Sequence, residues 1–263
     1  MDFSLLLTDE EYQERFAGKN HPTPYVYELR SGEQMLMYFG VRHSRNPDDA
    51  QWEKLKISWE DFFQKTSLRR IILLEGGKPL QLEDNWSNVV RKYGEAGVIL
   101  SFSRGSGVEI AWPDLAINKE AEKLSEQFES NLVAYYIFAR SAGAWLRAGT
   151  MGTFDEVLMK AAVATSQRVF SAPDTVSVYA AIHNQIFKHP LDETQKKVII
   201  RASAPVYYDS IINDIARASS RFRNEHIVNE VERYWKEGYS IFLVFGSAHA
   251  VIQEAALRAM VEK

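Results

Sequence analysis

Two histidines stand at the same spacing from a glycine, each directly after an apolar run. Residues 40–43 read Gly-Val-Arg-His and residues 246–249 read Gly-Ser-Ala-His. An apolar run that ends at a glycine is typical of a buried strand, and open α/β sheets bind ligands beyond the carboxyl ends of their strands. A neutral imidazole in that position can bind a metal ion or transfer a proton. We therefore expect His43 and His249 to belong to one functional site.

An acidic residue holds the equivalent position on a third predicted strand. Glu75 follows the apolar run 71–74 and comes just before Gly76 and Gly77. A single Gly-x-x-His motif is a weak signal, because a histidine at a strand end is more often structural. Two such motifs with an acidic strand end between them favour a shared site over two unrelated structural histidines.

Two chemistries remain open for these three residues. His43, Glu75 and His249 can hold a divalent metal ion such as manganese, cobalt or zinc, with coordination positions left for a substrate. Alternatively, Glu75 acts as a general base on a water molecule without a metal, and an arginine stabilises the anion that forms. The sequence does not separate these two chemistries.

Five further residues are weaker candidates. Glu95 stands at a predicted helix start, where it either caps the helix or faces the site. Arg42 either binds an anionic group of the substrate or lies on the surface, and Ser247 can donate a hydrogen bond to a substrate. Glu109 lies inside a predicted strand, where it faces either the cavity or water. Asp114, just after that strand, is better placed by the strand-end argument.

The apolar periodicity predicts strands and helices that alternate, followed by a long helical segment. Strands are expected at 25–30 and 35–39, joined as a hairpin, and at 70–75, 108–112 and 239–245; helices are expected from 47, over 86–93, from 95 and after 246. Residues 118–237 are almost wholly helical in pattern, with a long amphipathic stretch over 120–146. The expected fold is α/β, with a central mostly parallel or mixed sheet flanked by helices. We expect one domain, 1–263, with a helical insertion at about 118–237 before the last strand.

The composition narrows the classes of function. The 263 residues are 46% hydrophobic and 25% charged, as in a globular protein, and the absence of cysteine excludes thiol nucleophiles and thiolate metal sites. A net charge of -4 speaks against a nucleic-acid surface. We recognise no signal peptide and no membrane-spanning run, so we expect a cytoplasmic location. The sequence also lacks a Gly-x-Ser-x-Gly elbow, a His-Glu-x-x-His motif and a P-loop.

The ordered motifs resemble those of a known superfamily. Two Gly-x-x-His motifs around an acidic strand end, with Arg223-Asn224 in a helix that leads into the final strand and histidine, resemble the Tiki/TraB superfamily. Erythromycin esterases and the haem-binding ChaN proteins are similar more distantly. The resemblance covers about 25–263, although 118–216 matches only in being helical. It implies an erythromycin esterase/ChaN-like fold and adds Arg223 to the expected catalytic residues.

The resemblance and the residues together leave three hypotheses. The first is a hydrolase-like enzyme of the Tiki/TraB type, with or without a metal, that acts on a small-molecule or peptide substrate. Tiki members are described as metal-dependent peptidases of the membrane surface, but their substrate is not carried over to this chain. The second is a non-catalytic module that binds or senses a small ligand such as haem. The third is a scaffold whose helical segment meets a partner, with homo-oligomer formation left open.

Overall fold

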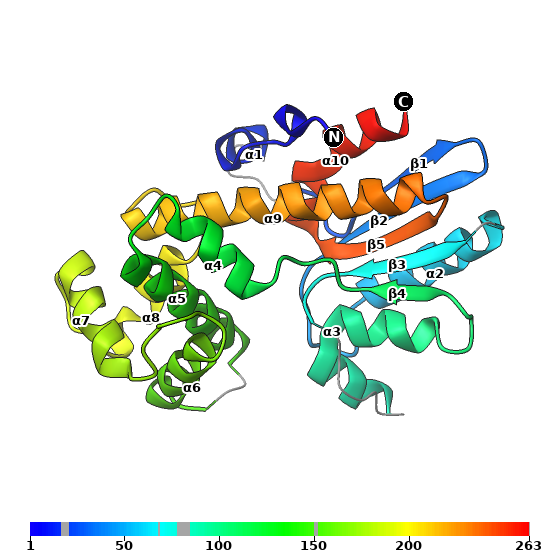
Figure 1. Ribbon diagram of the computed structural model, residues 1–263. Helices are drawn as coiled ribbons and strands as arrows, with labels where there is room; N and C mark the ends of the chain where they lie inside the picture. Colours follow the sequence, from blue (N-terminus) through cyan, green and yellow to red (C-terminus); the bar gives the residue numbers. More distant parts are fainter. Residues whose placement is uncertain (17–20, 68, 78–84, 150–151, 263) are drawn as a thin grey trace. The chain divides into compact units, whose positions relative to one another are not determined.

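The fold is built around a five-stranded sheet (Figure 1). The structure is a computed structural model and describes residues 1–16, 21–67, 69–77, 85–149 and 152–262. The strand order is β1-β2-β5-β3-β4, with β1 antiparallel to β2 and the other neighbours parallel. The expected α/β class and mixed sheet are confirmed. The strands are β1 (Tyr25–Ser31), β2 (Gln34–Val41), β3 (Arg70–Leu74), β4 (Glu109–Ala111) and β5 (Ser240–Gly246).

Helices form most of the remaining described chain. They are α1 (Asp9–Phe16), α2 (Gln51–Lys65), α3 (Trp86–Phe102), α4 (Ile117–Ser125), α5 (Ser130–Ala148), α6 (Phe154–Ser166), α7 (Val176–Phe187), α8 (Lys196–Ala202), α9 (Ile211–Lys236) and α10 (Ser247–Val261), with short 3-10 helices η1 (Phe3–Leu5) and η2 (Glu193–Gln195).

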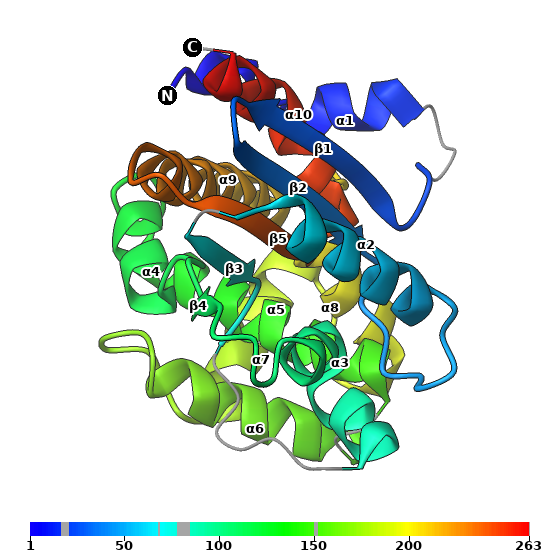
Figure 2. The same cartoon turned by 90° about the vertical axis from the view of Figure 1, so that its right-hand side faces the viewer.

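The register of the sheet brings three strand ends together. The last strand, β5, lies between β2 and β3, so that Val41 pairs with Gly246 and Leu74 pairs with Val244. All three strands run in the same direction, and their carboxyl ends are therefore neighbours at one edge. The expected hairpin is also present: β1 and β2 lie side by side with α10 packed against them (Figure 2), and Gly32 adopts a φ of 56° in the turn.

Alternation along the strands gives the sheet two apolar faces. In β2, Leu36 and Tyr38 belong to the core that includes buried residues of α9 and α10. Their neighbours Met37 and Phe39 belong to the core that includes α2 and α3. The burial of both faces explains why the central strands read as continuous apolar runs rather than as alternating ones.

Contacts divide the chain into two compact units. The first unit, the sheet unit, is Met1–Asp114 with Asn224–Lys263, and the second, the helical unit, is Leu115–Arg223. The helical unit ends earlier than the expected insertion at 118–237. The reason is that the second half of α9 contributes Ile227 and Val228 to the core of the sheet unit.

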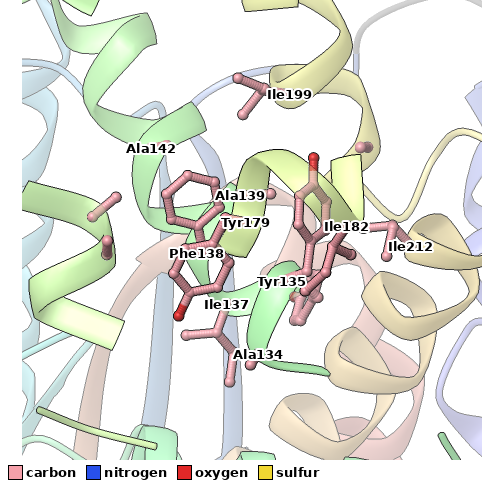
Figure 3. Close-up of a cluster of buried hydrophobic side chains, with 14 of the residues drawn as sticks. Ala134, Tyr135, Ile137, Phe138, Ala139, Ala142, Tyr179, Ile182, Ile199 and Ile212 are labelled. Carbon is pink, nitrogen blue, oxygen red and sulfur yellow. The ribbon is translucent and has the colours of Figure 1, made fainter. Parts of the chain in front are cut away.

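The helical unit has its own apolar core, built around α5. Phe138 of α5 stacks on Tyr179 of α7 with ring centroids 4.2 Å apart (Figure 3). The amphipathic stretch expected over 120–146 is two helices, because α4 ends at Ser125 and α5 begins at Ser130. A buried ion pair joins these two helices: Glu120 is 1% exposed and lies 2.5 Å from a guanidinium nitrogen of Arg140.

Candidate functional site

Three elements of the sheet unit position the three expected site residues. His43 follows β2 by two residues, and Glu75 follows β3 directly, with its backbone N–H donating to the Val244 carbonyl at 3.2 Å. His249 lies in the first turn of α10, which starts immediately after β5. The site therefore forms at the carboxyl edge of β2, β5 and β3.

The carboxylate of Glu75 lies between the two imidazoles. Its Oε2 is 3.6 Å from His43 Nε2, and its Oε1 is 3.7 Å from His249 Nε2. Gly246 fixes this carboxylate, because its backbone N–H donates to Oε2 at 2.7 Å. The expected convergence of His43, Glu75 and His249 is present in the structure.

Each imidazole is held from behind through its Nδ1 atom. His43 Nδ1 lies 2.7 Å from Glu95 Oε1, and His249 Nδ1 lies 2.8 Å from Asn224 Oδ1. An ionised carboxylate can only accept hydrogen bonds, so the contact with Glu95 places a hydrogen on His43 Nδ1. Both rings consequently turn Nε2 toward Glu75.

The site is open on the side of His43. The side chain of His43 is 60% exposed, whereas those of Glu75 and His249 are each 14% exposed. His43 is therefore the most accessible of the three side chains, while Glu75 and His249 lie in a less hydrated environment.

Glu95 reaches the site through a break in α3. Gly94 has a φ of 55° and a ψ of −137°, which interrupts the helix between the expected segments 86–93 and 95 onward. Only glycine adopts such angles without strain. Glu95 is the first residue after the break, and the structure places it against His43 rather than in a helix cap alone.

From the sequence, Asn224 is recognised only as part of the Arg223-Asn224 motif, with no role of its own at the site. It is 1% exposed in the middle of α9, and its Oδ1 also accepts a hydrogen bond from Gln253 Nε2 at 2.8 Å. A signal was present: Asn224, Ile227, Val228 and Val231 follow the i, i+3, i+4, i+7 spacing of one helix face. A polar residue on an apolar helix face indicates a buried polar partner.

The glycines of both Gly-x-x-His motifs are needed for close packing rather than for a positive φ. A Cβ on Gly246 would lie 2.9 Å from His43 Nε2 and 3.3 Å from Glu75 Oε2. A Cβ on Gly40 would lie 2.9 Å from both Ser247 Cα and the Tyr25 carbonyl oxygen. Gly40 thus leaves room for the start of α10 to pack against β2, and Gly246 leaves room for the side chains of His43 and Glu75.

Glu109 does not join the site. It opens β4 and pairs with Ile71 at the amino end of β3, and its Oε2 accepts a hydrogen bond from the Tyr239 hydroxyl at 2.7 Å. This contact lies at the opposite edge of the sheet from Glu75, so Glu109 is not among the residues that the structure brings together at the carboxyl edge. Asp114 follows β4 at the carboxyl edge, and its role stays a prediction.

Arg42 has a local partner in the structure. Its guanidinium donates to Asp49 Oδ2 at 2.8 Å, and the two side chains line a small hollow together with Lys54. Burial opposes ionisation of Asp49, but hydrogen bonds from Arg42 and the Gln51 backbone hold the pKa of Asp49 below its ordinary value. A substrate role for Arg42 would require it to share this guanidinium with Asp49.

Ser247 and Arg223 each adjoin a residue of the site in the sequence. Ser247 is the first residue of α10, directly after the glycine that binds Glu75. Arg223 precedes Asn224 on α9 and belongs to the helical unit. The proposed contact of Ser247 with substrate and the proposed catalytic role of Arg223 stay predictions.

Neither metal geometry nor similarity to known proteins identifies the site. Among the described residues, no three His, Cys, Asp or Glu side chains are close enough as they stand to hold one metal ion. The described helices include none that is long and apolar enough to cross a membrane. The chain matches no family model, no curated protein and no solved structure.

Proposed function

We propose that the carboxyl edge of β2, β5 and β3 is the active site of a hydrolase. One observation carries this proposal: two imidazoles, each tied through Nδ1, turn Nε2 toward the two oxygens of one carboxylate. The Nε2–oxygen distances of 3.6 and 3.7 Å exceed a direct hydrogen bond. They suit groups that act together on a third atom, such as the oxygen of an attacking water.

His43 is the proposed general base. The carboxylate of Glu95 accepts from Nδ1 and stabilises the imidazolium that forms when Nε2 takes a proton, as the aspartate of a Ser-His-Asp triad does. The exposure of His43 lets it reach both a water and the leaving group of a substrate. The same proton can then pass from Nε2 to the leaving group.

His249 has a different partner and a different proposed role. Asn224 offers it a neutral oxygen, and the first turn of α10 disfavours a positive charge because the helix dipole is positive there. We therefore assign His249 the neutral imidazole, which binds and orients through Nε2. Glu75, fixed by the Gly246 N–H, supplies the negative charge between the two rings.

The donor set also suits a divalent cation. Metal-ligating histidines usually donate their second ring nitrogen to an oxygen acceptor, as His43 and His249 do here. In the described positions these three side chains do not form a metal-binding group, so one ion would bind only after a rearrangement, in which the exposed His43 is free to take part. Held by His43, Glu75 and His249, such an ion would polarise the substrate and favour a hydroxide nucleophile at neutral pH.

The proposed substrate is a small molecule or peptide with an ester or amide bond, consistent with the resemblance to the Tiki/TraB superfamily. The test is hydrolysis of a panel of chromogenic esters and aminoacyl amides, with and without added manganese, cobalt or zinc. His43→Gln and Glu75→Gln should each abolish any turnover, whereas His189→Gln, an exposed histidine of the helical unit, should not. Equal rates for all four proteins would remove the proposal.

A further inference from the structure

We propose that Asn224, Gln253 and Tyr38 are positioning residues that fix the hydrogen of His249 on Nδ1. Their catalytic meaning rests on the proposed hydrolase, but the hydrogen position itself does not. The inference begins from an uninterrupted chain of hydrogen bonds. The Tyr38 hydroxyl donates to Gln253 Oε1 at 3.0 Å, Gln253 Nε2 donates to Asn224 Oδ1 at 2.8 Å, and the same oxygen lies 2.8 Å from His249 Nδ1.

This chain runs through the apolar core of the sheet unit. Tyr38 and Gln253 are fully buried and Asn224 is 1% exposed, so water cannot replace any of these contacts. The residues come from β2, α10 and α9, and Gln253 lies one helical turn after His249. Three buried polar groups thus satisfy one another in a line whose more exposed end is a site histidine.

The direction of the chain decides which nitrogen of His249 carries hydrogen. Asn224 Oδ1 accepts from Gln253, and a second donor to the same oxygen must be His249 Nδ1–H. Nε2 then keeps its lone pair and faces Glu75. If both amides were reversed, Asn224 would donate to Nδ1, and Nε2 would carry the hydrogen.

The described direction also satisfies the far end of the chain. The hydroxyl hydrogen of Tyr38 finds its acceptor in Gln253 Oε1, which reversal of the amide would remove. Tyr38 therefore sets the orientation of Gln253, which sets that of Asn224, which sets the tautomer of His249. A residue of β2 thereby controls the nitrogen that faces Glu75.

The result is a pair of histidines that have the same tautomer and different hydrogen-bond partners behind Nδ1. Glu95 fixes the tautomer of His43 with a charged acceptor and also stabilises its imidazolium. The chain of Asn224, Gln253 and Tyr38 fixes the tautomer of His249 through hydrogen bonds between neutral side chains. Glu75 then lies between two nitrogens that both offer lone pairs, an arrangement that attracts a proton or a cation and not a second anion.

The experiment reads the tautomer directly and needs no substrate. The full chain is labelled with ¹⁵N-histidine, and long-range ¹H–¹⁵N correlation at pH 8 shows which ring nitrogen of each histidine is protonated. His249→Gln and His43→Gln assign the two ring systems. We expect both rings to be Nδ1–H, and a predominant Nε2–H signal for His249 in the wild type would overturn the proposal.

Variants then test each link. Asn224→Ala should lose the Nδ1–H pattern of His249 and show an Nε2–H fraction, whereas Asn224→Asp, which keeps an acceptor oxygen, should retain it. Tyr38→Phe removes only the hydroxyl and should raise the Nε2–H fraction to a detectable level, which keeps the test usable if Asn224→Ala does not fold. An unchanged His249 tautomer in Tyr38→Phe and in folded Asn224→Ala would contradict the proposal.

Asn213→Ala is the matched control. Asn213 is also 1% exposed on α9, but its amide donates to the backbone carbonyls of Arg201, Ala202 and Ala204. Its loss should lower stability without changing the tautomer of His249. Where turnover is measurable, Asn224→Ala should reduce kcat by about 10- to 100-fold, as loss of a residue that orients a ligating histidine does. If the wild type shows no turnover but its His249 ring carries hydrogen on Nδ1, the proposed hydrolase function is wrong and the proposed role of the positioning residues still holds.

Discussion

Glu75 Oε2 accepts the backbone N–H of Gly246 at 2.7 Å, so the acid of the site is anchored by the glycine of the second motif. The same glycine has no room for a side chain, because a Cβ would come within 2.9 Å of His43 Nε2. The backbone of one motif thereby fixes the acid and leaves space for the histidine of the other.

Gly246→Ala and Gly40→Ala should therefore fail in different ways. At Gly246 the closest atom belongs to the exposed ring of His43, which can move, so the melting temperature should change little while the His43–Glu75 geometry and any turnover are lost. At Gly40 the new Cβ meets backbone of Ser247 and Tyr25, and overpacking of this kind costs roughly 1–3 kcal/mol. Thermal melts with ¹⁵N-histidine spectra check this, and equal losses of stability would contradict it.

Replacement of the site histidines should separate function from stability. His43→Gln should leave the melting temperature within about 1–2 °C of the wild type, because His43 is 60% exposed. His249→Gln should cost more, since Asn224 loses one of its donors. Both variants should lose any activity. A loss of several degrees for His43→Gln would mean that His43 is a structural residue.

Metal binding should depend on the oxygens behind the histidines as well as on the histidines. In calorimetric titrations with manganese, cobalt or zinc, Glu75→Gln should abolish binding to the site, and Glu95→Gln should weaken it by about 10- to 100-fold. Glu109→Gln, at the opposite edge of the sheet, is the control and should bind as the wild type does. If the wild type binds none of the three ions, the site works without a metal, with His43 as the general base and Glu95 as its hydrogen-bond partner.

The stability of the helical unit should depend on pH through His183. This side chain is fully buried, with Nδ1 2.6 Å from the Tyr135 hydroxyl, and burial lowers its pKa below the ordinary 6.5. The unfolded chain therefore binds more protons below pH 6.5, and stability present above that pH is lost as the pH falls.

The slope approaches about 1.4 kcal/mol per pH unit where the unfolded His183 is protonated and the folded one is not. Urea unfolding of wild type and His183→Gln between pH 5 and 8 measures it, and the variant should lose this contribution. Parallel pH profiles for the two proteins would show that His183 titrates alike in both states.

The sequence predicted the residues at the strand ends better than their neighbours in space. His43, Glu75 and His249 could be recognised because an apolar run followed by a polar residue marks a strand end locally. The position of β5 between β2 and β3 could not be read, since pairing between distant segments has no local signal. The role of Asn224 was missed for the same reason, because its partner His249 lies on another helix.

Glu109 shows why a residue inside a predicted strand is hard to place. The strand expected over 108–112 forms as Glu109–Ala111, and its first residue pairs with Ile71 at the amino end of β3, at the opposite edge of the sheet from Glu75. Glu95 was a weak candidate because its role depends on the break in α3 at Gly94. The backbone angles of a glycine inside a helical pattern cannot be predicted from the sequence.

The place of β5 between β2 and β3 has a consequence for the order of events during synthesis. The ribosome synthesises β2 and β3 long before residues 240–246. Until β5 is made, the strand that lies between β2 and β3 in the sheet is missing. Two long apolar edges stay open over the translation of more than half the chain, which is a hazard for aggregation. Insertion of β5 pairs both open strand edges at once and brings Gly246 and His249 to the sheet. Completion of the sheet and assembly of the site are therefore the same step of folding.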